Sequence, residues 1–266
     1  MYQSNKVGVV VPAFNEEQLL EQTLTGIPEW VDRIVIVDDA STDQTPVIAK
    51  EMCQRDSRIR FHRHEIRRGP GRAIISGYGL FHEEGQFDSV AVMAGDNQMD
   101  PNDLHQLIRP LCENRADYVK GTRFRHPDLH RVMPRTRFLG NRVLTWLTRY
   151  VAGYPELEDA QCGYTAIRGA LLGDILENGL VDGYGLPNSI LAFLGARNAR
   201  LEQVPVRPIY GNEKSGLNLR TVLAVYPALL WRAWLAPKPG KEWRPYRIEH
   251  ETPKRGASPK NRLTIS

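Results

Sequence analysis

The stretch AVMAGDNQMDP, at residues 91–101, joins an apolar run to a polar loop. The apolar letters predict a buried strand over residues 89–94, with Asp96, Gln98 and Asp100 in the loop at its carboxyl end. In an open α/β sheet, ligands bind at that end of the strands. Clustered hard oxygen ligands suit Mg²⁺ or Mn²⁺ and leave positions open for phosphate oxygens. A plain polar loop before a helix that begins at the proline would give the same letters, so a metal site and a structural loop both stay open.

On either side of this stretch, apolar runs typical of strands alternate with segments whose apolar residues are spaced as in helices. This alternation predicts an α/β fold with a mostly parallel sheet and helices on both faces. A capping box formed by Ser41 and Gln44 predicts a helix that starts there and continues to about Arg55. The other expected helices cover 17–27, 71–84 and 103–113, and the other expected strands cover 7–11, 34–37, 59–62 and 118–121.

The composition bounds the class of protein. A chain of 266 residues with 41% hydrophobic content can bury one substantial core. Cys53, Cys112 and Cys162 are widely spaced and show neither a pairing nor a metal-ligand pattern, which favours a reducing, cytosolic setting. The amino terminus has a short apolar run without a small-residue cleavage site, so we expect a strand there and not a signal peptide.

Positive charge is concentrated at the carboxyl end. Residues 237–266 hold eight Lys or Arg against three Glu, a charge of +5, whereas the whole chain carries +4. Such a tail can contact an anionic membrane or a nucleic acid, or can simply be solvated. Before it, apolar residues at helical spacing predict an amphipathic helix over 217–236, too short in its uncharged part to span a bilayer. That helix would lie at a membrane interface, or pack on the core or on a second copy.

The first two expected strands also end in polar residues. Asn15 and Glu16 follow the first, and Asp38, Asp39 and Ser41 follow the second. These groups gather at one edge of the sheet, where they could accept hydrogen bonds from a nucleotide's base or ribose. The two residues Asp39 and Ser41 could instead be turn and helix-cap residues. The glycines of residues 67–73 fit neither phosphate-loop fingerprint and predict only a tight helix entry.

Five motifs follow one another along the chain: PAFNE at 12–16, VDDAS at 37–41, GDNQMDP at 95–101, GTRF at 121–124 and DAQCGY at 159–164. In this order and spacing they resemble the family-two glycosyltransferases, in particular the dolichyl-phosphate mannose or glucose synthases and their polyprenyl-phosphate relatives. The resemblance covers about residues 6–215 and implies a GT-A, Rossmann-like catalytic domain over 1–216. The amphipathic helix over 217–236 and the basic tail over 237–266 would follow it.

The resemblance implies roles for the motif residues. The first two motifs would hold the nucleotide sugar, and the acidic motif would hold Mg²⁺ or Mn²⁺. The chain departs from the family pattern at Ala94, where an aspartate is common, so the metal would depend on Asp96 and Gln98. We expect Asp100 to cap the following helix. The implied nucleotide-sugar contacts are Pro12, Ala13, Asn15, Glu16, Asp38, Asp39, Gly95 and Asp96.

Arginines are implied to bind the acceptor phosphate. Arg123 and Arg137 lie where lipid-phosphate synthases place arginines, and Asn141 follows the second at the expected spacing. The fork of donors on arginine suits a phosphate better than the point charge of lysine. A soluble helix surface could use the same residues equally well. The resemblance adds Lys214 and Ser215, in a late loop that closes over the phosphates.

The expected chemistry follows from the acceptor. A phosphate monoester has a second pKa of about 6, so it is largely ionised near pH 7 and needs no strong base to attack the anomeric carbon. A divalent metal would neutralise charge on the leaving diphosphate, and the outcome would be inversion. The implied catalytic residues are Asp96, Asp159 and Arg137. A hydroxyl acceptor would instead need a base, for which Asp159 or Glu158 would be the candidates.

The leading hypothesis is therefore an inverting, metal-dependent enzyme that moves a hexose from a donor such as GDP-mannose or UDP-glucose to a polyprenyl or dolichyl phosphate. It would associate peripherally with the cytoplasmic face of a membrane, no nucleic-acid partner is expected, and the oligomeric state stays open. One alternative is a family-two transferase that acts on a glycan or small-molecule hydroxyl with Asp159 as base. The other is a non-catalytic protein that binds a nucleotide sugar or a nucleic acid.

Overall fold

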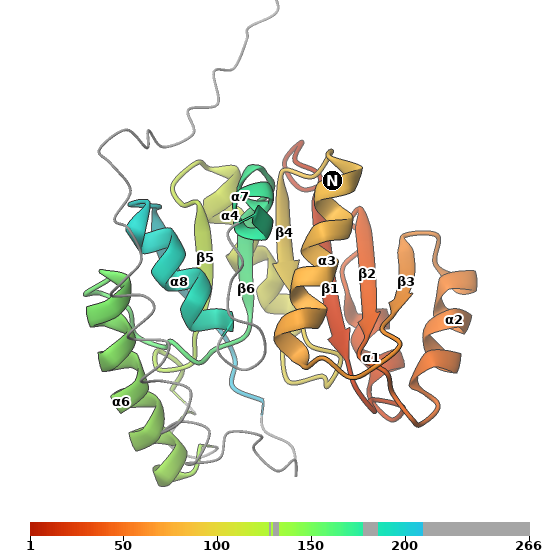
Figure 1. Ribbon diagram of the computed structural model, residues 1–266, viewed down its shortest axis with the longest axis horizontal. Helices are drawn as coiled ribbons and strands as arrows, with labels where there is room; N and C mark the ends of the chain where they lie inside the picture. The colour runs from red at the N-terminus through yellow and green to blue at the C-terminus, as the bar shows by residue number, and fades with distance from the viewer. Residues whose placement is uncertain (128, 130–132, 178–185, 210–266) are drawn as a thin grey trace, which may run out of the picture.

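The computed structural model describes residues 1–127, 129, 133–177 and 186–209. Within these residues a seven-stranded sheet has the order β3-β2-β1-β4-β6-β5-β7 (Figure 1). Its pairs are parallel except for those of β6, which runs antiparallel to β4 and β5. The strands are β1 (Val7–Ala13), β2 (Arg33–Asp38), β3 (Ile59–Arg63), β4 (Ser89–Val92), β5 (Tyr118–Thr122), β6 (Thr165–Arg168) and β7 (Leu201–Pro205).

Helices cover both faces of the sheet, which confirms the predicted α/β architecture. Alternate residues of β1 point to opposite faces, as the two-residue period of a strand requires. Val9 belongs to a core with α1, α2 and α4, whereas Val10 belongs to a core with α3, α7 and α8. The helices are α1 (Leu20–Gly26), α2 (Thr45–Arg55), α3 (Pro70–Glu84), α4 (Leu104–Cys112), α6 (Arg135–Ala152), α7 (Leu172–Glu177) and α8 (Leu186–Ala196), with short 3₁₀ turns η1 (Pro101–Asp103) and η2 (Gly169–Leu171).

Helix α3 approaches β1 closely because two glycines leave room for it. A Cβ at Gly77 would lie 2.4 Å from Val10 Cγ1, and one at Gly8 would lie 2.3 Å from the ring of Phe81. Neither contact is possible for a larger residue without a shift of its neighbours. In Figure 1, α3 and α8 lie in front of the sheet, and α6 lies next to α8 at the left edge of the molecule.

The direction of β6 brings a late part of the chain to the same edge as the early loops. The strands β1, β2, β4, β5 and β7 run the same way, so their carboxyl ends share one edge of the sheet. Because β6 is antiparallel, the segment that precedes it, residues 158–164, lies at that edge as well. Strand order also reverses between β1 and β4, which is where open α/β sheets bind ligands.

The predicted capping box at Ser41 is wrong. Helix α2 begins at Thr45, and its first residue outside, Gln44, makes no side-chain cap. The Ser41 hydroxyl instead accepts a hydrogen bond of 2.9 Å from the backbone N–H of Asn15. A tertiary contact to the loop after β1 therefore replaces the local cap.

The expected amphipathic helix over 217–236 and the basic tail over 237–266 lie outside the described residues. Among those described, no helix has both the length and the apolar character needed to cross a bilayer.

Candidate active site

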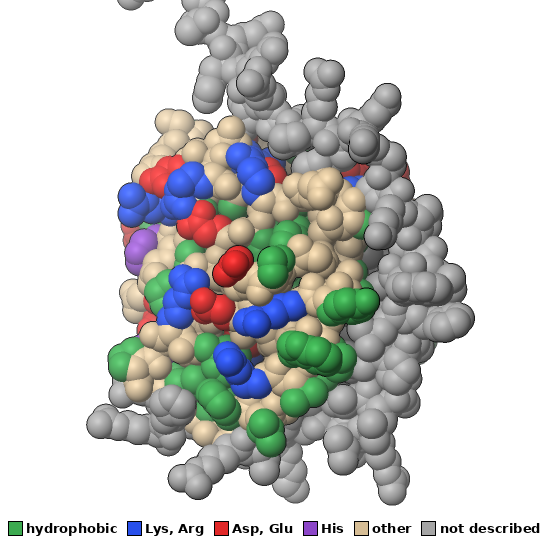
Figure 2. Space-filling model, turned by 90° about the vertical axis from the view of Figure 1, so that its left-hand side faces the viewer, with side chains coloured by type: hydrophobic (Ala, Val, Ile, Leu, Met, Phe, Trp, Pro, Cys, Tyr) green, Lys and Arg blue, Asp and Glu red, His purple; other side chains and the backbone are tan. Residues whose placement is uncertain are grey.

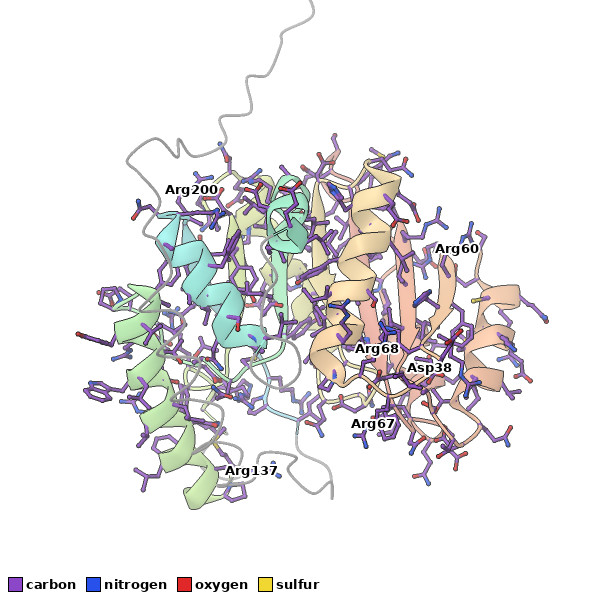
Figure 3. The ribbon with its side chains drawn as sticks, viewed as in Figure 1. Asp38, Arg60, Arg67, Arg68, Arg137 and Arg200 are labelled. Atoms are coloured by element: carbon purple, nitrogen blue, oxygen red, sulfur yellow. The ribbon has the colours of Figure 1, made fainter. Side chains whose placement is uncertain are left out.

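Most of the predicted site residues lie along one edge of the sheet. Figure 3 shows Asp38, Arg67, Arg68 and Arg137 along the lower edge, where β1 and β2 end, and Arg200 at the opposite edge. The loops after β1, β2, β4, β5 and β7 meet there with the segment before β6. The topology therefore collects all five sequence motifs at one place.

The loops after β1 and β2 are tied together by side chains. Asn15 N–H donates to Ser41 Oγ, and Thr42 N–H donates to Asn15 Oδ1, both at 2.9 Å. Glu16 N–H donates to Thr45 Oγ1 at 2.7 Å. These bonds place the PAFNE and VDDAS motifs side by side, as the predicted nucleotide site requires.

The other predicted nucleotide contacts, at the end of β1 and after β4, are joined to neighbouring segments by backbone hydrogen bonds. Gly95 N–H donates to the Pro12 carbonyl at 3.0 Å, and Asp39 N–H donates to the Ala13 carbonyl at 2.9 Å. The hydroxyl of Thr23 donates to the Gly95 carbonyl at 3.1 Å. The strand ends are thus held in register where a nucleotide would lie.

Asp38 and Asp39 are both buried but have different partners. Asp38 accepts the N–H of Ser41 at 3.2 Å and forms an ion pair of 3.1 Å with Arg63. These contacts make Asp38 part of the turn after β2. A contact between its side chain and a nucleotide stays a prediction.

Asp39 holds the chain between β3 and α3. It accepts hydrogen bonds from His64 Nδ1 at 2.8 Å, Arg68 N–H at 2.8 Å and Gly69 N–H at 2.6 Å. Burial alone would raise the pKa of this carboxyl, but the hydrogen bonds from His64 and the two amides outweigh burial and lower it. A carboxylate has about four acceptor positions, so one further donor from a ligand can still be accommodated.

His64 was not predicted from the sequence. Its Nε2 lies 2.9 Å from Ser76 Oγ, so the ring bridges Asp39 to helix α3. The loop that this contact fixes carries Arg67, whose guanidinium lies 3.8 Å from the ring centre of Phe14 in the PAFNE motif. No local motif marks a histidine of this kind, because its role depends on the tertiary position of the loop.

A pocket of about 150 Å³ joins the acidic loop to the later motifs. Asp96 and Gln98 reach it from the loop after β4, Arg123 from the loop after β5, and Gln161 and Tyr164 from the segment before β6. The remaining lining residues are Met99, Cys162, Gly163, Val206, Arg207 and Ile209. The structure therefore brings the predicted metal ligands and one of the predicted phosphate-binding arginines to a single pocket.

The oxygen ligands of this pocket fit a hard divalent cation that is bound together with a substrate. Asp96 and Gln98 supply oxygens, and the Asp96 carboxylate is oriented by the N–H of Gln98 at 3.0 Å. Across the described residues, no group of three His, Cys, Asp or Glu is arranged to hold a metal ion. Mg²⁺ usually takes only one or two carboxylates and completes its shell with phosphates and water, so this set is sufficient.

The structure also shows the hydrogen bonds of two other residues near the acidic loop. Asp100 caps η1, because its Oδ1 accepts the N–H of Asn102 at 2.9 Å, as predicted. At the position of the missing aspartate, the N–H of Ala94 donates to Met99 Sδ at 3.3 Å. The thioether thus lies beside the position where the family pattern has a carboxylate.

Asp159 is the buried partner of Arg123. Arg123 Nε donates to Oδ2 at 2.8 Å and Nη2 donates to Oδ1 at 2.9 Å, a two-pronged pair. The carboxylate is fully buried. Burial would raise the pKa of Asp159, but the charge of Arg123 and its hydrogen bonds lower it below the usual range.

This geometry gives Asp159 a different role from the ones considered in the sequence. It orients Arg123. An ionised, buried carboxylate held by an arginine is a weak proton acceptor, which argues against Asp159 as a general base. Glu158, the other candidate base, is paired with Arg125 at 2.8 Å and accepts a hydrogen bond from Thr122.

Lys120 is a buried cation beside the pocket residue Cys162 that sequence reasoning missed. It is fully buried on β5, and its ammonium donates to the carbonyl of Cys162. Burial lowers the pKa of Lys120, while the neighbouring Cys162 and Asp159 partly offset that shift. The signal in the sequence is a lysine inside an apolar strand, YVKGT at β5.

Arg137 and Asn141 lie on α6 and are not among the described residues that line the pocket. Figure 3 shows Arg137 at the lower end of this helix, along the same edge as the site. The predicted contacts Lys214 and Ser215 lie outside the described residues. Acceptor binding by these four residues stays a prediction.

Comparison with known proteins identifies the family. A family model described as "Glycosyl transferase family 2" matches residues 8–176, more than half of the chain. The chain therefore belongs to glycosyl transferase family 2, as the motifs predicted.

Several relatives are named for lipid-phosphate acceptors. The UDP-N-acetylglucosamine–dolichyl-phosphate N-acetylglucosaminyltransferase of Methanococcus voltae is 27% identical over 215 residues, which are 76% of this chain and 85% of that protein. A dolichyl-phosphate beta-glucosyltransferase of Trichomonas vaginalis is 24% identical over 84% of this chain and 72% of its own length. This chain is similar to both.

The fold is that of solved GT-A proteins, which confirms the predicted fold class. The crystal structure of Mycobacterium tuberculosis glucosyl-3-phosphoglycerate synthase superposes with a TM-score of 0.66 at 21% identity, covering 86% of this chain and 81% of that one. Another crystal structure of that enzyme, with a TM-score of 0.64, contains Mn²⁺, UDP-glucose and phosphoglyceric acid.

Proposed function

We propose that this protein transfers a hexose or N-acetylhexosamine from a nucleotide sugar to a polyprenyl or dolichyl phosphate, with inversion at the anomeric carbon. One observation carries this proposal. Arg123, fixed by the buried Asp159, lines the same pocket as Asp96 and Gln98. A cationic group for an anionic acceptor and oxygen ligands for a donor diphosphate therefore face one small volume.

The acceptor side of the reaction needs position more than proton transfer. A phosphate monoester is largely ionised at pH 7, so its oxygen can attack the anomeric carbon directly. An arginine can hold a carboxylate with one edge and a phosphate with another, because its guanidinium carries several donors in a fixed plane. Arg123 would in this way orient the acceptor, and Asp159 would orient Arg123.

The donor side uses the loops after β1, β2 and β4. Asn15, Glu16 and Asp39 would bind the nucleoside, and Asp96 with Gln98 would hold Mg²⁺ or Mn²⁺ against the diphosphate. When bound, the metal would neutralise the charge that develops on the leaving diphosphate. Relatives named for dolichyl-phosphate and dodecaprenyl-phosphate acceptors support the choice of acceptor. Since such lipids are held in a bilayer, we place the enzyme peripherally at the cytoplasmic face of a membrane.

The test is a transfer assay with purified protein and a short prenyl phosphate. Labelled UDP-N-acetylglucosamine, UDP-glucose and GDP-mannose are offered separately with Mg²⁺, with Mn²⁺ and with a chelator. We expect labelled prenyl-phosphate sugar from at least one donor, dependent on the metal, with the anomeric configuration inverted in the product's NMR spectrum. No lipid product with any donor, while the label is instead transferred to a glycan or small hydroxyl acceptor, would refute the proposal.

The test variant replaces the arginine that lines the pocket, and its matched control replaces a neighbouring arginine that does not. Arg123→Lys keeps the charge but loses the two-pronged geometry, so we expect a higher KM for the prenyl phosphate and little change in KM for the donor. Arg125→Lys, at an arginine that is 47% exposed and paired with Glu158, is expected to behave like the wild type.

A further inference from the structure

One side of α6 exposes large apolar side chains in a regular row. Leu139 is 66% exposed, Val143 51%, Trp146 66% and Tyr150 84%. Their spacing of four, three and four residues places them along one side of the helix. In the described part of the chain, the other exposed large apolar side chains lie singly, on separate segments.

This row is not the face by which α6 packs on the protein. Leu144, Thr148 and Ala152 are buried on another side of the helix. There the Thr148 hydroxyl lies 3.0 Å from the side-chain oxygen of Asn188 on α8. The helix is therefore anchored independently of the exposed row, which needs another explanation.

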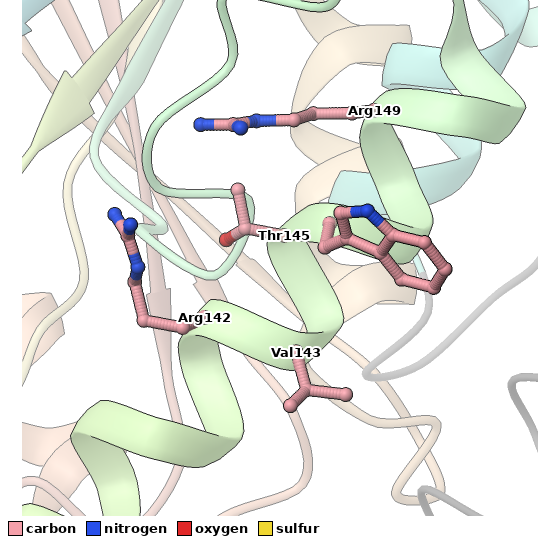
Figure 4. Close-up of a pocket in the computed structure, with 5 residues that line it drawn as sticks. Arg142, Val143, Thr145 and Arg149 are labelled. Atoms are coloured by element: carbon pink, nitrogen blue, oxygen red, sulfur yellow. The ribbon is translucent and has the colours of Figure 1, made fainter.

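The charge of α6 has a single sign. The helix spans Arg135–Ala152, contains four arginines and has no acidic residue. Arg142 and Arg149 line a groove of about 310 Å³ together with Val143, Thr145 and Trp146 (Figure 4). Figure 2 views this side of the molecule, and in its lower half hydrophobic and basic side chains lie next to one another. Apolar and cationic groups thus share one surface.

We propose that the row formed by Leu139, Val143, Trp146 and Tyr150 is the surface by which this protein docks onto an anionic lipid bilayer. Tryptophan and tyrosine favour the boundary between head groups and acyl chains, because each has an apolar body and a polar tip. Arginines beside them are attracted to anionic head groups. The α6 surface has both features, and the helix is anchored to the core rather than inserted across the bilayer.

The charge of α6 disfavours other occupants. A second copy placed symmetrically on the same face would bring arginines of both helices together without acids to pair them. The basic residues 237–266, with a charge of +5, would be repelled in the same way. An anionic bilayer instead matches both the charge and the apolar row.

Docking through α6 would also place the site at the membrane. Arg137 lies at the end of this helix that is nearest the carboxyl edge of the sheet (Figure 3). A helix held on the bilayer would keep that edge at the level of the lipid phosphates. This part of the inference rests on the proposed lipid-phosphate acceptor, whereas bilayer binding itself does not.

The first test is sedimentation of the full chain with vesicles. Vesicles of phosphatidylcholine alone are compared with vesicles that contain phosphatidylglycerol as well. We expect the wild type to bind the anionic vesicles, and Trp146→Ser with Tyr150→Ser to lower the partition coefficient by about tenfold or more. Val143→Ser should lower it by a few fold. Its matched control is Val47→Ser on α2, 49% exposed on the other side of the molecule, which should bind like the wild type.

A second measurement separates this inference from the proposed function. Trp146→Ser with Tyr150→Ser should keep wild-type transfer to a short, water-soluble prenyl phosphate but lose transfer to a long-chain one embedded in vesicles. If no transfer is detected at all, vesicle binding still tests the surface. Equal vesicle binding by the wild type and the double variant would overturn the inference. So would a wild-type dimer in analytical ultracentrifugation that the double variant abolishes, because the row would then be an interface between copies.

Discussion

The ion pair between Asp159 and Arg123 allows a quantitative prediction. Asp159 is fully buried and the Arg123 side chain is only 19% exposed, so solvent screens the pair little. Asp159→Asn keeps the shape of the side chain but removes its charge and one of its two acceptor oxygens. Breaking a buried pair from one side costs about 3–5 kcal/mol, because the remaining charge stays buried. We expect a loss at the lower end of this range, since asparagine still accepts one hydrogen bond.

The same substitution should weaken acceptor binding. Arg123 would lose the carboxylate that fixes its plane, and a hydrogen bond from a charged group contributes about 1.5–3 kcal/mol. We therefore expect kcat/KM for the prenyl phosphate to fall by about 10- to 100-fold, while KM for the nucleotide sugar stays within about twofold of the wild type. Urea unfolding and steady-state kinetics measure the two effects separately.

The matched control is Glu158→Gln at the adjacent residue. The pair of Glu158 with Arg125 has side chains 29% and 47% exposed, so its loss should cost no more than about 1 kcal/mol. If Asp159→Asn destabilises the protein no more than Glu158→Gln does, the pair of Asp159 with Arg123 contributes no more to stability than an exposed pair. If it leaves kcat/KM for the acceptor unchanged, Arg123 does not bind the acceptor.

The depressed pKa of Asp159 adds a pH dependence to this comparison. A carboxylate whose pKa is lower in the folded state contributes stability above its unfolded pKa of about 3.9, and loses it as the pH falls through the folded value. The difference in unfolding free energy between the wild type and Asp159→Asn should therefore be complete at pH 7 and shrink below about pH 4. A difference that does not change between pH 7 and pH 3 would contradict the lowered pKa.

Three further changes test the packing, the metal site and the buried lysine. Gly77→Ala should lower the unfolding free energy by about 1–3 kcal/mol, because its Cβ would lie 2.4 Å from a valine of β1. Gly79→Ala on the same helix would have nothing within 4 Å of its Cβ and should raise the unfolding free energy by about 0.5–1 kcal/mol. Urea titrations measure both. Asp96→Asn and Gln98→Ala should each raise the metal concentration needed for half-maximal transfer, by about tenfold or more for Asp96→Asn. Unchanged metal titrations of both variants would exclude a metal site at these two residues. Burial lowers the pKa of Lys120 in the folded state. The unfolding free energy of the wild type should therefore rise relative to that of Lys120→Met as the pH increases from 7 toward the unfolded lysine pKa of about 10.4. Equal differences in unfolding free energy at pH 7 and pH 10 would contradict this.

Much of the fold was predictable because the parallel strands are buried on both faces. The strands β1, β2 and β4 appear in the sequence as continuous apolar runs, which few other elements produce. Two strands were not predicted. The short β6, TAIR, ends in Arg168, and β7, LEQVP, carries two polar residues at the edge of the sheet, so neither shows an apolar run. Their positions depend on pairing with distant strands, which local sequence does not reveal.

The site was predictable to the extent that it follows from topology. Acids that directly follow parallel strands must share an edge, so Asp39 and Asp96 could be placed near one another before any contact was known. The partners of those acids could not be. His64 reaches Asp39 only through the path of the chain after β3, and Asp159 reaches Arg123 only because β6 is antiparallel.

Each of the loops after β1, β2 and β4 contains one residue in a strained backbone conformation. Asn15, Ala40 and Asn97, one in each loop after β1, β2 and β4, have φ values of +57°, +60° and +55°. This region costs an ordinary residue about 1–2 kcal/mol, and asparagine less because its side chain bonds locally. Ala40 has no such bond, so the contacts around it, including the one between Asn15 and Thr42, must offset its strain. Strain of this kind persists only where surrounding contacts over-determine the backbone, so this edge of the sheet is formed before a ligand arrives, and binding of the proposed nucleotide need not order it.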